Sequence, residues 1–364
     1  MRLAGIFAGA AAILAALGAQ PAQARNAVPE KRQERPARLA DGQLLIVITL
    51  AAQRVAVYAD GALAIRSHVA TGVPGHPTPT GIFSVIGKER YHASNIYSGA
   101  PMPFMQRITW SGIALHQGVV PGGRPASHGC IRLTPDFAHL LYGATKLGAR
   151  VIIAQNEVQP ADFAHPFLFA LNPAPPPQAD RAAATKTAKA EAVTAVDAVT
   201  VSEPDPLAKE LDAQESKKEL VQASGPISIF ISAKEKKLFV RRQFLPVFEA
   251  PVSIRDGERP IGTHVFTALS TADPARLRWL AVSVPDNLKP KASGKEGRKG
   301  RDMGDFRDDD RPSTAAEALD RIDVPAELRA RLEQIMSVGA SVIVSDRGLG
   351  DETGEGTDFV VLTR

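Results

Sequence analysis

Apolar residues recur along residues 44–70 in short patterns that are typical of β-strands. Leu44–Leu50 is a continuous apolar run rich in β-branched side chains, and Arg54–Tyr58 alternates between polar and apolar positions. Asp60-Gly61 then predicts a hairpin turn into a third strand, Ala62–Ala70. These patterns predict that the first folded region opens with three strands.

Loops and strands are predicted to alternate through residues 71–116. Thr71–Gly81 is too rich in proline and glycine for anything but a loop, and Ile82–Ile86 returns to a strand pattern. Lys88–Arg107 is predicted to be irregular. Ile108–Leu115 predicts a further strand, which delivers His116 at its end.

One helix is predicted near the end of this region. Thr134 is a favourable N-cap residue, Pro135 suits the first helical position, and Asp136 complements the helix dipole. The helix is expected to run to about Lys146, before a closing strand at Arg150–Ala154. Residues 44–155 are therefore predicted to form a mainly β domain with one short helix.

The same order of patterns recurs from Gly225 onward. The matched segments are Ile46–Val57 with Ile229–Val240, Pro79–Gly81 with Pro260–Gly262, Pro135 with Pro325, and Gly148–Ile153 with Gly339–Val344. Aligning the two prolines places Asp320 where Cys130 stands. Residues 225–364 are thus predicted to be a degenerate, β-rich, non-catalytic repeat. The alternative is an unrelated β domain with generic strand patterns.

The compositions of the remaining segments are typical of a cleaved signal peptide or of disordered chain. Residues 1–24 are typical of a secretory signal peptide, with a basic start, an apolar run and an Ala22-Gln23-Ala24 cleavage site. A polar leader follows at 25–43. Residues 172–224 are expected to form a disordered linker, and 285–313 a disordered charged insertion. We therefore expect an exported protein of the periplasm or cell wall, with no membrane span after cleavage.

The distribution of charged residues limits the kinds of binding partner that we expect. The charge is spread along the chain, with no basic stripe interleaved with aromatic residues, so no nucleic acid is expected despite a pI near 9.2. Leu44–Gln155 carries nine Lys or Arg against three Asp or Glu. This positive balance favours substrates that carry carboxylates.

Cys130 is the only cysteine among 364 residues. Cysteines of exported proteins usually pair in disulfides, so a lone one is either an inert buried residue or a reactive thiol. His116 and His128 precede it by fourteen and two residues, and Gly129 is adjacent. A thiol with imidazoles nearby is what nucleophilic catalysis requires, and this pattern favours the reactive thiol.

Together these features resemble the L,D-transpeptidase catalytic domain, the YkuD family, over roughly Leu44–Ala154. The resemblance is carried by the early strands, Thr71-Gly72, Pro77–Phe83, Leu115-His116 and Ser127–Arg132. It departs from the family where Gln117 replaces a frequent Gly, where Arg132 replaces a frequent Asn, and in a short loop between His116 and Cys130. The resemblance implies a β-sandwich with a short helix near the nucleophile.

The implied reaction is remodelling of peptidoglycan without a cofactor or metal. Such enzymes attack a tetrapeptide stem at the carbonyl of its third residue, a diamino acid, and release D-Ala. The acyl group then passes to an amine, either on another stem as a 3→3 cross-link or on a wall-anchored lipoprotein. An L,D-carboxypeptidase or wall-lipoprotein hydrolase would use water instead.

The resemblance also implies roles for individual residues. Cys130 is the expected nucleophile and His116 the general base and acid, with His128 as the alternative base. Gly129, with Cys130 and His128, is expected to supply oxyanion donors, and Ser127 and His128 to orient the loop. Candidates for substrate binding are Arg132 as a carboxylate clamp, Tyr97 and Trp110.

Two other classes of function compete with this prediction. Zinc bound by His116, His128 and Cys130 would make a hydrolase, but no helix-borne His pair or carboxylate motif supports it. A non-enzymatic wall-binding scaffold is a reasonable alternative for residues 225–364.

Overall fold

The computed structural model describes residue 39 and residues 42–97, 99–169, 225–273, 276–286 and 311–363. The predicted signal peptide, almost all of the leader, the linker at 172–224 and most of the insertion at 285–313 lie outside the described residues. Within the described chain no helix is long and apolar enough to span a membrane.

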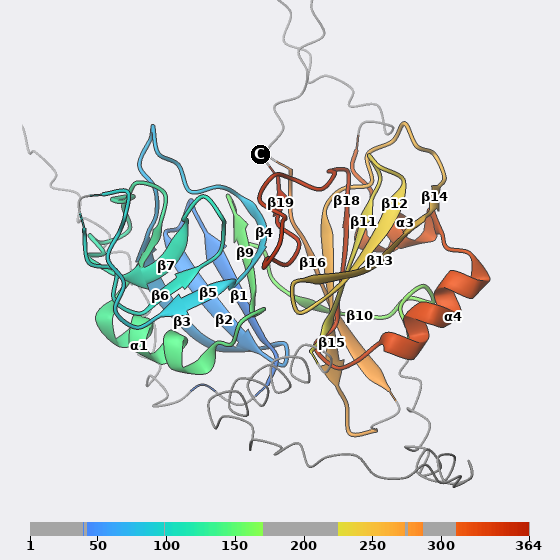
Figure 1. Ribbon diagram of the computed structural model, residues 1–364, viewed down its shortest axis with the longest axis horizontal. Coiled ribbons are helices and arrows are strands. Elements are labelled where there is room, and N and C mark those ends of the chain that lie inside the picture. The colour runs from blue at the N-terminus through green and yellow to red at the C-terminus, as the bar shows by residue number, and fades with distance from the viewer. Residues whose placement is uncertain are drawn as a thin grey trace, which may run out of the picture. The chain divides into compact units, whose positions relative to one another are not determined.

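The described part of the chain is mainly β, as predicted, and the first region contributes nine strands to one sheet (Figure 1). In chain order they are β1 Leu44–Thr49, β2 Arg54–Ala59, β3 Ala62–Ala70, β4 Gly81–Ser84, β5 Gly87–Glu89, β6 Met105–Arg107, β7 Ala114–Gln117, β8 Ile131–Leu133 and β9 Arg150–Ala154. Their order in space is β4-β9-β1-β2-β3-β8-β7-β6-β5. Buried faces of these strands form one apolar core with the helix α1, Pro135–Ala144.

The segment before His116 differs from the prediction of one strand at Ile108–Leu115. The chain turns at Thr109–Gly112, where Gly112 has φ +100° and its amide donates to the Thr109 carbonyl. The strand begins only at Ala114. Because a side chain is strained at that φ, the glycine permits the turn. His116 still lies in the strand that follows, one residue before its end.

The helix α1 begins at Pro135 as predicted and ends at Ala144, two residues earlier than expected. Thr134 has the extended backbone of an N-cap, but its hydroxyl makes no capping hydrogen bond. At the other end, Lys88 Nζ donates to the carbonyls of Tyr142 and Thr145. A cation at this end offsets the negative pole of the helix.

The described residues of the second region contribute six strands to a second large sheet and also form a separate two-stranded sheet and two helices (Figure 1). Its elements are β11 Ile227–Ser232, β12 Lys237–Arg242, β13 Leu245–Pro251, β14 Ser253–Ile254, β15 His264–Ser270, β16 Leu277–Ser283, α3 Ala315–Asp320, β17 Ile322–Asp323, α4 Ala326–Ile335 and β18 Ser341–Ser345. The order β15-β18-β11-β12-β13 repeats β4-β9-β1-β2-β3 of the first sheet. In both, only one of these four pairings is parallel, β1 with β9 and β11 with β18.

The strand pairings show that one predicted match between the two regions, Pro79–Gly81 with Pro260–Gly262, is wrong by two residues. Ser84 pairs with Arg150 in the first sheet, and Thr267 pairs with Ser341 in the second. Counting along the paired strands then places His264 at the position of Gly81. The Pro-x-Gly pattern at 260–262 therefore lies two residues earlier than its counterpart, because paired backbones rather than loop residues set the register.

Each region also gives one strand to the other region's sheet. The strand β10, Ala161–Phe163, follows the first region in sequence but pairs with β16. The strand β19, Val361–Leu362, follows the second region but pairs with β4. Neither exchange is predicted by the sequence patterns, because both strands are only two or three residues long.

A buried ion pair joins the same parts of the chain. Arg150 of β9 donates to Asp358 at 2.9 Å, and their side chains are 7% and 6% exposed. The guanidinium also donates to the hydroxyls of Ser84 and Ser341. Buried charges are tolerated only when they are paired and hydrogen-bonded, and this pair is both.

Candidate active site

The parallel strands β7 and β8 bring the two predicted catalytic residues to one face of the sheet. His116 pairs directly with Arg132, and Cys130 lies two residues before Arg132. Cys130 immediately precedes β8, and its side chain lines the same pocket as those of His116 and Arg132. Leu115, Ile131 and Leu133 occupy the opposite face and are fully buried. Burial of that apolar face fixes the register that aligns the polar one.

His116 is buried, with 7% of its surface exposed. Its Nδ1 lies 2.8 Å from the carbonyl oxygen of Gln117. A carbonyl only accepts, so Nδ1 carries the proton and Nε2 is the basic nitrogen. Burial lowers the pKa of His116; the hydrogen bond to the Gln117 carbonyl raises that pKa by less, and the positive charge of Arg132 lowers it a little further. The imidazole is therefore held neutral, the form that accepts a proton.

The Cys130 thiol is also partly withdrawn from water. Sγ lies 3.7 Å from the Gly112 carbonyl oxygen, to which it donates. Burial raises the pKa of the Cys130 thiol, and backbone hydrogen bonding at Ala114 and the charge of Arg132 offset part of that increase. With a neutral thiol and a neutral imidazole lining one pocket, attack by the sulfur would require proton transfer rather than a pre-formed ion pair.

The loop before Cys130 is shaped by its own hydrogen bonds. The Ser127 hydroxyl donates to the Cys130 carbonyl at 2.5 Å and accepts from the Gly129 amide at 3.2 Å. Gly129 has φ +111°, and a Cβ there would lie 2.8 Å from Ile113 Cδ1. Ser127 thus holds the loop, while the amide of Gly129, a predicted oxyanion donor, is directed at Ser127.

The proline- and glycine-rich loop at 71–81 supports the nucleophile loop from outside. The Thr78 hydroxyl donates to the Gly129 carbonyl at 2.7 Å and accepts from the Gly72 amide at 2.8 Å. The amide of Ser127 donates to the Thr71 carbonyl. Gln53, buried in a left-handed turn, in turn binds both the amide and the hydroxyl of Thr71. Thr78 lies within Pro77–Phe83, which carries part of the family resemblance, but the sequence predicted no role for its side chain and gave no signal for Gln53. Both roles depend on contacts between distant segments.

A pocket of about 860 Å³ opens onto Cys130 and His116. Ser127, His128, Arg132 and Tyr97 also line it, so it gathers most of the residues predicted from the sequence. Much of its remaining wall is apolar and was not predicted, with contributions from Pro101, Met102, Pro103, Val119 and Val120.

His128 and Trp110 are placed differently from Cys130 and His116. His128 is exposed and its ring stacks on Tyr97, with centroids 5.0 Å apart, while His76 contacts it edge-on at 4.9 Å. Trp110 is half exposed and does not line the pocket; a Cβ on Gly354 would lie 3.3 Å from its Nε1. Tyr97 is therefore the aromatic candidate that the pocket retains.

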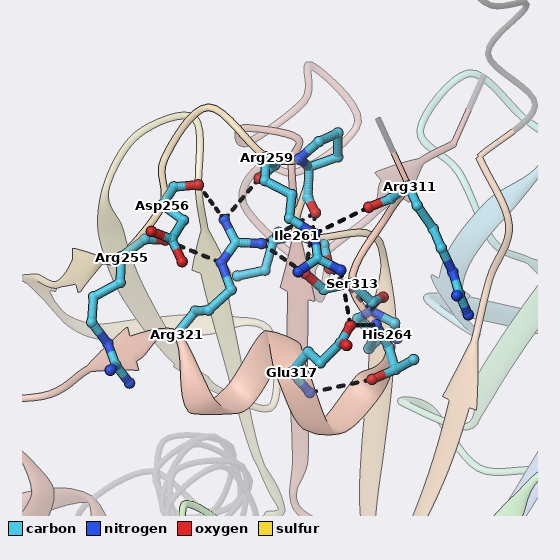
Figure 2. Close-up of polar contacts among 11 residues, drawn as sticks. Arg255, Asp256, Arg259, Ile261, His264, Arg311, Ser313, Glu317 and Arg321 are labelled. Atoms are coloured by element: carbon cyan, nitrogen blue, oxygen red, sulfur yellow. Dashed lines mark hydrogen bonds and ion pairs between the residues drawn. The ribbon is translucent and has the colours of Figure 1, made fainter. Parts of the chain in front are cut away.

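In the second region, loop residues gather around a buried arginine (Figure 2). Arg321 donates to the carbonyls of Arg255, Asp256, Arg259 and Pro260 and to the Ser313 hydroxyl, at 2.6–3.2 Å. Next to it, Asp320, the residue that alignment of Pro325 with Pro135 matches to Cys130, has a side chain that is 70% exposed beside His165. The guanidinium of Arg321 thus ties carbonyls within residues 255–260 to one another and to Ser313.

The only histidine of the second region is committed to structural hydrogen bonds. His264 Nε2 donates toward the carbonyls of Ile261 and Ser313, both at 3.1 Å, and Nδ1 lies 2.9 Å from the Ser283 hydroxyl. Across the described ranges, no group of three or more His, Cys, Asp or Glu side chains is placed to hold a metal ion.

Comparison with known proteins identifies the first region. Residues 43–153 match the YkuD family, the L,D-transpeptidase catalytic domain. Among curated proteins, L,D-transpeptidase 1 of Mycobacterium tuberculosis is 30% identical over 120 residues, which cover 29% of this chain and 48% of that protein. The chain therefore matches about half the length of its curated relatives.

Several solved structures that are similar to the chain are L,D-transpeptidases. One from Mycobacterium smegmatis is 28% identical and aligns over 30% of this chain and 58% of its own, with a TM-score of 0.29. One from Stackebrandtia nassauensis is 26% identical over 35% and 62%, with a TM-score of 0.30. A third, solved in complex with imipenem, is 28% identical over 31% and 59%, with a TM-score of 0.29.

Proposed function

Because residues 43–153 carry an L,D-transpeptidase catalytic domain of the YkuD family, we propose that this protein is a peptidoglycan L,D-transpeptidase with Cys130 as its nucleophile. The observation that carries the proposal is the shared face of β7 and β8. It places a thiol, a neutral imidazole and a guanidinium on one pocket.

Acylation begins with proton transfer from the Cys130 thiol to Nε2 of His116. The sulfur forms a bond to the carbonyl carbon of the diamino acid in a tetrapeptide stem, and the carbonyl oxygen becomes an oxyanion. When the tetrahedral intermediate collapses, the bond to D-Ala breaks and the leaving amine takes the proton from His116. The product is a thioester on Cys130 and free D-Ala.

Deacylation reverses these proton transfers with a different nucleophile. An amine of a second stem attacks the thioester carbon and gives its proton to His116. The thiolate then leaves and recovers that proton, which regenerates the starting thiol. The result is a 3→3 cross-link, or an anchored protein when the amine belongs to a wall lipoprotein.

Donors for the oxyanion are proposed at the nucleophile loop. The proposed donors are the amides of Cys130 and His128, whereas the Gly129 amide becomes available only if it gives up its hydrogen bond to the Ser127 hydroxyl. One such donor is typically worth about 3 kcal/mol of transition-state stabilisation.

Arg132 is the proposed contact for a substrate carboxylate. It lines the pocket, and its stem packs over Gly118, where a Cβ would lie 2.9 Å from Arg132 Cγ. A glycine at 118 thus leaves room for the stem, and the planar guanidinium is suited to two carboxylate oxygens at once. Its position on the face of His116 and Cys130 supports this role.

The second region is proposed to be a degenerate copy without catalysis. The shared strand order, Asp320 at the position of Cys130 and the closed Arg321 cluster support this. The signal-like residues 1–24 support export, and we propose the periplasm or cell wall as the site of action.

The test is mass spectrometry of the full chain incubated with a disaccharide-tetrapeptide. We expect a thioester adduct on Cys130, release of D-Ala, and 3→3 dimers. Tripeptide without dimers would instead identify a carboxypeptidase. An absent adduct in the wild type, or an equal adduct in Cys130→Ala, would overturn the assignment of the nucleophile. Imipenem offers a second probe, with one covalent adduct expected at the single cysteine.

A further inference from the structure

The segment 350–363 of the second region contacts two loops that hold Cys130. Its first contact is at β4, where the Thr363 amide donates to the Thr80 carbonyl at 3.0 Å and the two hydroxyls lie 3.1 Å apart. Thr80 and Thr363 are almost completely buried. The backbones approach so closely that a Cβ on Gly81 would overlap the Val361 carbonyl oxygen.

This first contact lies two residues from a direct support of the nucleophile loop. Thr78, in the same extended stretch as Thr80, donates its hydroxyl hydrogen bond to the Gly129 carbonyl. The contact with Thr363 therefore restricts the position of Thr80, and through the chain that of the Thr78 hydroxyl. Because this hydroxyl binds the Gly129 carbonyl, the contact also restricts the loop that ends in Cys130.

The second contact is at the turn Thr109–Ile113. The Ser111 amide donates to Glu352 Oε2 at 3.2 Å, and Trp110 packs beside Gly354. The next residue, Gly112, supplies the carbonyl that accepts from Cys130 Sγ. The same turn brings Ile113 against Gly129. The segment is thus one residue from the group that touches the thiol.

The second region holds this segment independently of those loops. The Arg241 guanidinium donates to the carbonyls of Gly354 and Thr357, at 2.8 and 2.7 Å. Phe359 is fully buried in the apolar cluster that both sheets share. The segment is anchored in one region and makes its terminal contacts in the other.

We propose that the segment 350–363 is a positioning element of the active site, and that its contacts at Thr80 and Ser111 hold Cys130 in its working orientation. The inference rests on the proposed role of Cys130 as nucleophile. It also predicts the reactivity of the thiol toward alkylation, which can be measured without the enzymatic reaction. It gives the second region a catalytic consequence although that region has no nucleophile of its own.

The test uses Thr363→Val in the full chain, because valine keeps the volume but removes the hydroxyl. The matched control is Thr263→Val, since Thr263 makes a similar buried hydroxyl pair with Ser345 at 2.8 Å, in the second sheet. Glu352→Ala removes the other contact at a partly exposed position. Alkylation by iodoacetamide reports only on Cys130, because it is the only cysteine.

Loosening the loops exposes the thiol, so its pKa should fall toward the ordinary value. We expect Thr363→Val and Glu352→Ala to shift the pH midpoint of alkylation downward and to raise its rate at pH 7.5 by about fivefold. Turnover of the disaccharide-tetrapeptide should fall while KM stays the same. Thr263→Val should leave all three quantities unchanged.

Alkylation unchanged in both test variants, or changed equally in Thr263→Val, would overturn the positioning role. If alkylation shifts as expected but even the wild type never acts on stem peptides, the proposed function fails and the positioning role of the segment stands.

Discussion

The hydroxyl of Thr78 donates a 2.7 Å hydrogen bond to the carbonyl of Gly129, 51 residues further along the chain. The same hydroxyl accepts from the Gly72 amide, and Thr78 is 1% exposed. One buried side chain thus ties the proline- and glycine-rich loop to the nucleophile loop.

Replacing Thr78 by valine should loosen both loops. The change leaves a buried carbonyl and a buried amide without their partner, which typically costs about 1–3 kcal/mol. Urea denaturation should show that loss, and formation of the Cys130 thioester should slow. Thr78→Ser keeps the hydroxyl and should retain most of both properties; equal losses in the two variants would point to the methyl group instead.

Gly129→Ala should be more harmful than its backbone angle alone predicts. A side chain at φ +111° is strained, and the new Cβ would meet Ile113 Cδ1 at 2.8 Å. We expect a loss of about 1–3 kcal/mol in unfolding free energy and little acylation. Gly123→Ala is the matched control, since Gly123 has φ +74° but no atom near the Cβ position. The difference between the two variants measures the contact at Ile113 together with the greater backbone strain at φ +111°.

His116→Ala should reduce the rate of Cys130 acylation by about a hundredfold or more, because it removes the proposed base. His128→Ala should have a smaller effect, since that exposed ring stacks on Tyr97 and His76. Rates of imipenem adduct formation measured by intact mass would separate the two. A larger loss in His128→Ala would transfer the role of base to His128.

The pH dependence of alkylation should reflect burial of the catalytic pair. Burial raises the pKa of the Cys130 thiol above its ordinary value of 9.0 and lowers that of His116 below its ordinary value of 6.5. Iodoacetamide alkylation should therefore keep increasing above pH 9. A midpoint near pH 6–7 would instead indicate a thiolate–imidazolium pair in the resting protein.

Stability should fall on acidification below about pH 6.5, for a related reason. Burial lowers the pKa of His264 as well as that of His116, so the unfolded chain binds protons that the folded chain excludes. The free energy of unfolding is then largest above the ordinary histidine pKa and is lost as the pH falls. In His264→Gln, urea denaturation at pH 5 and 7 should give a smaller difference; an unchanged difference would assign it to other groups.

Removing one member of the buried pair between Arg150 and Asp358 should be costly. Arg150→Met leaves the buried carboxylate of Asp358 without its cationic partner. Such a change typically lowers the free energy of unfolding by about 3–5 kcal/mol. Arg150→Met combined with Asp358→Asn removes both charges and should recover part of that loss in urea denaturation. If the double variant is no more stable than Arg150→Met, the cost comes from packing and not from the unpaired charge.

The site could be predicted from the sequence to the extent that its parts are local. Cys130 stands out because it is the only cysteine, and His116 because it follows an apolar strand pattern. The apolar patterns of the five strands common to both sheets could also be recognised locally, since each strand carries its own buried face. Counting along those patterns misplaced the Pro-x-Gly correspondence by two residues, because a loop pattern does not fix a pairing register.

The sequence by itself determined the mainly β fold and the residues of the family motif, because strand periodicity and residue type are properties of short segments. Only the tertiary structure decided that Thr78 supports Gly129, that Trp110 lies outside the pocket, and that β19 pairs with β4. These relations join segments separated by tens to hundreds of residues. They follow from which buried backbone and side-chain groups find partners after both sheets have formed, and no local pattern encodes that choice.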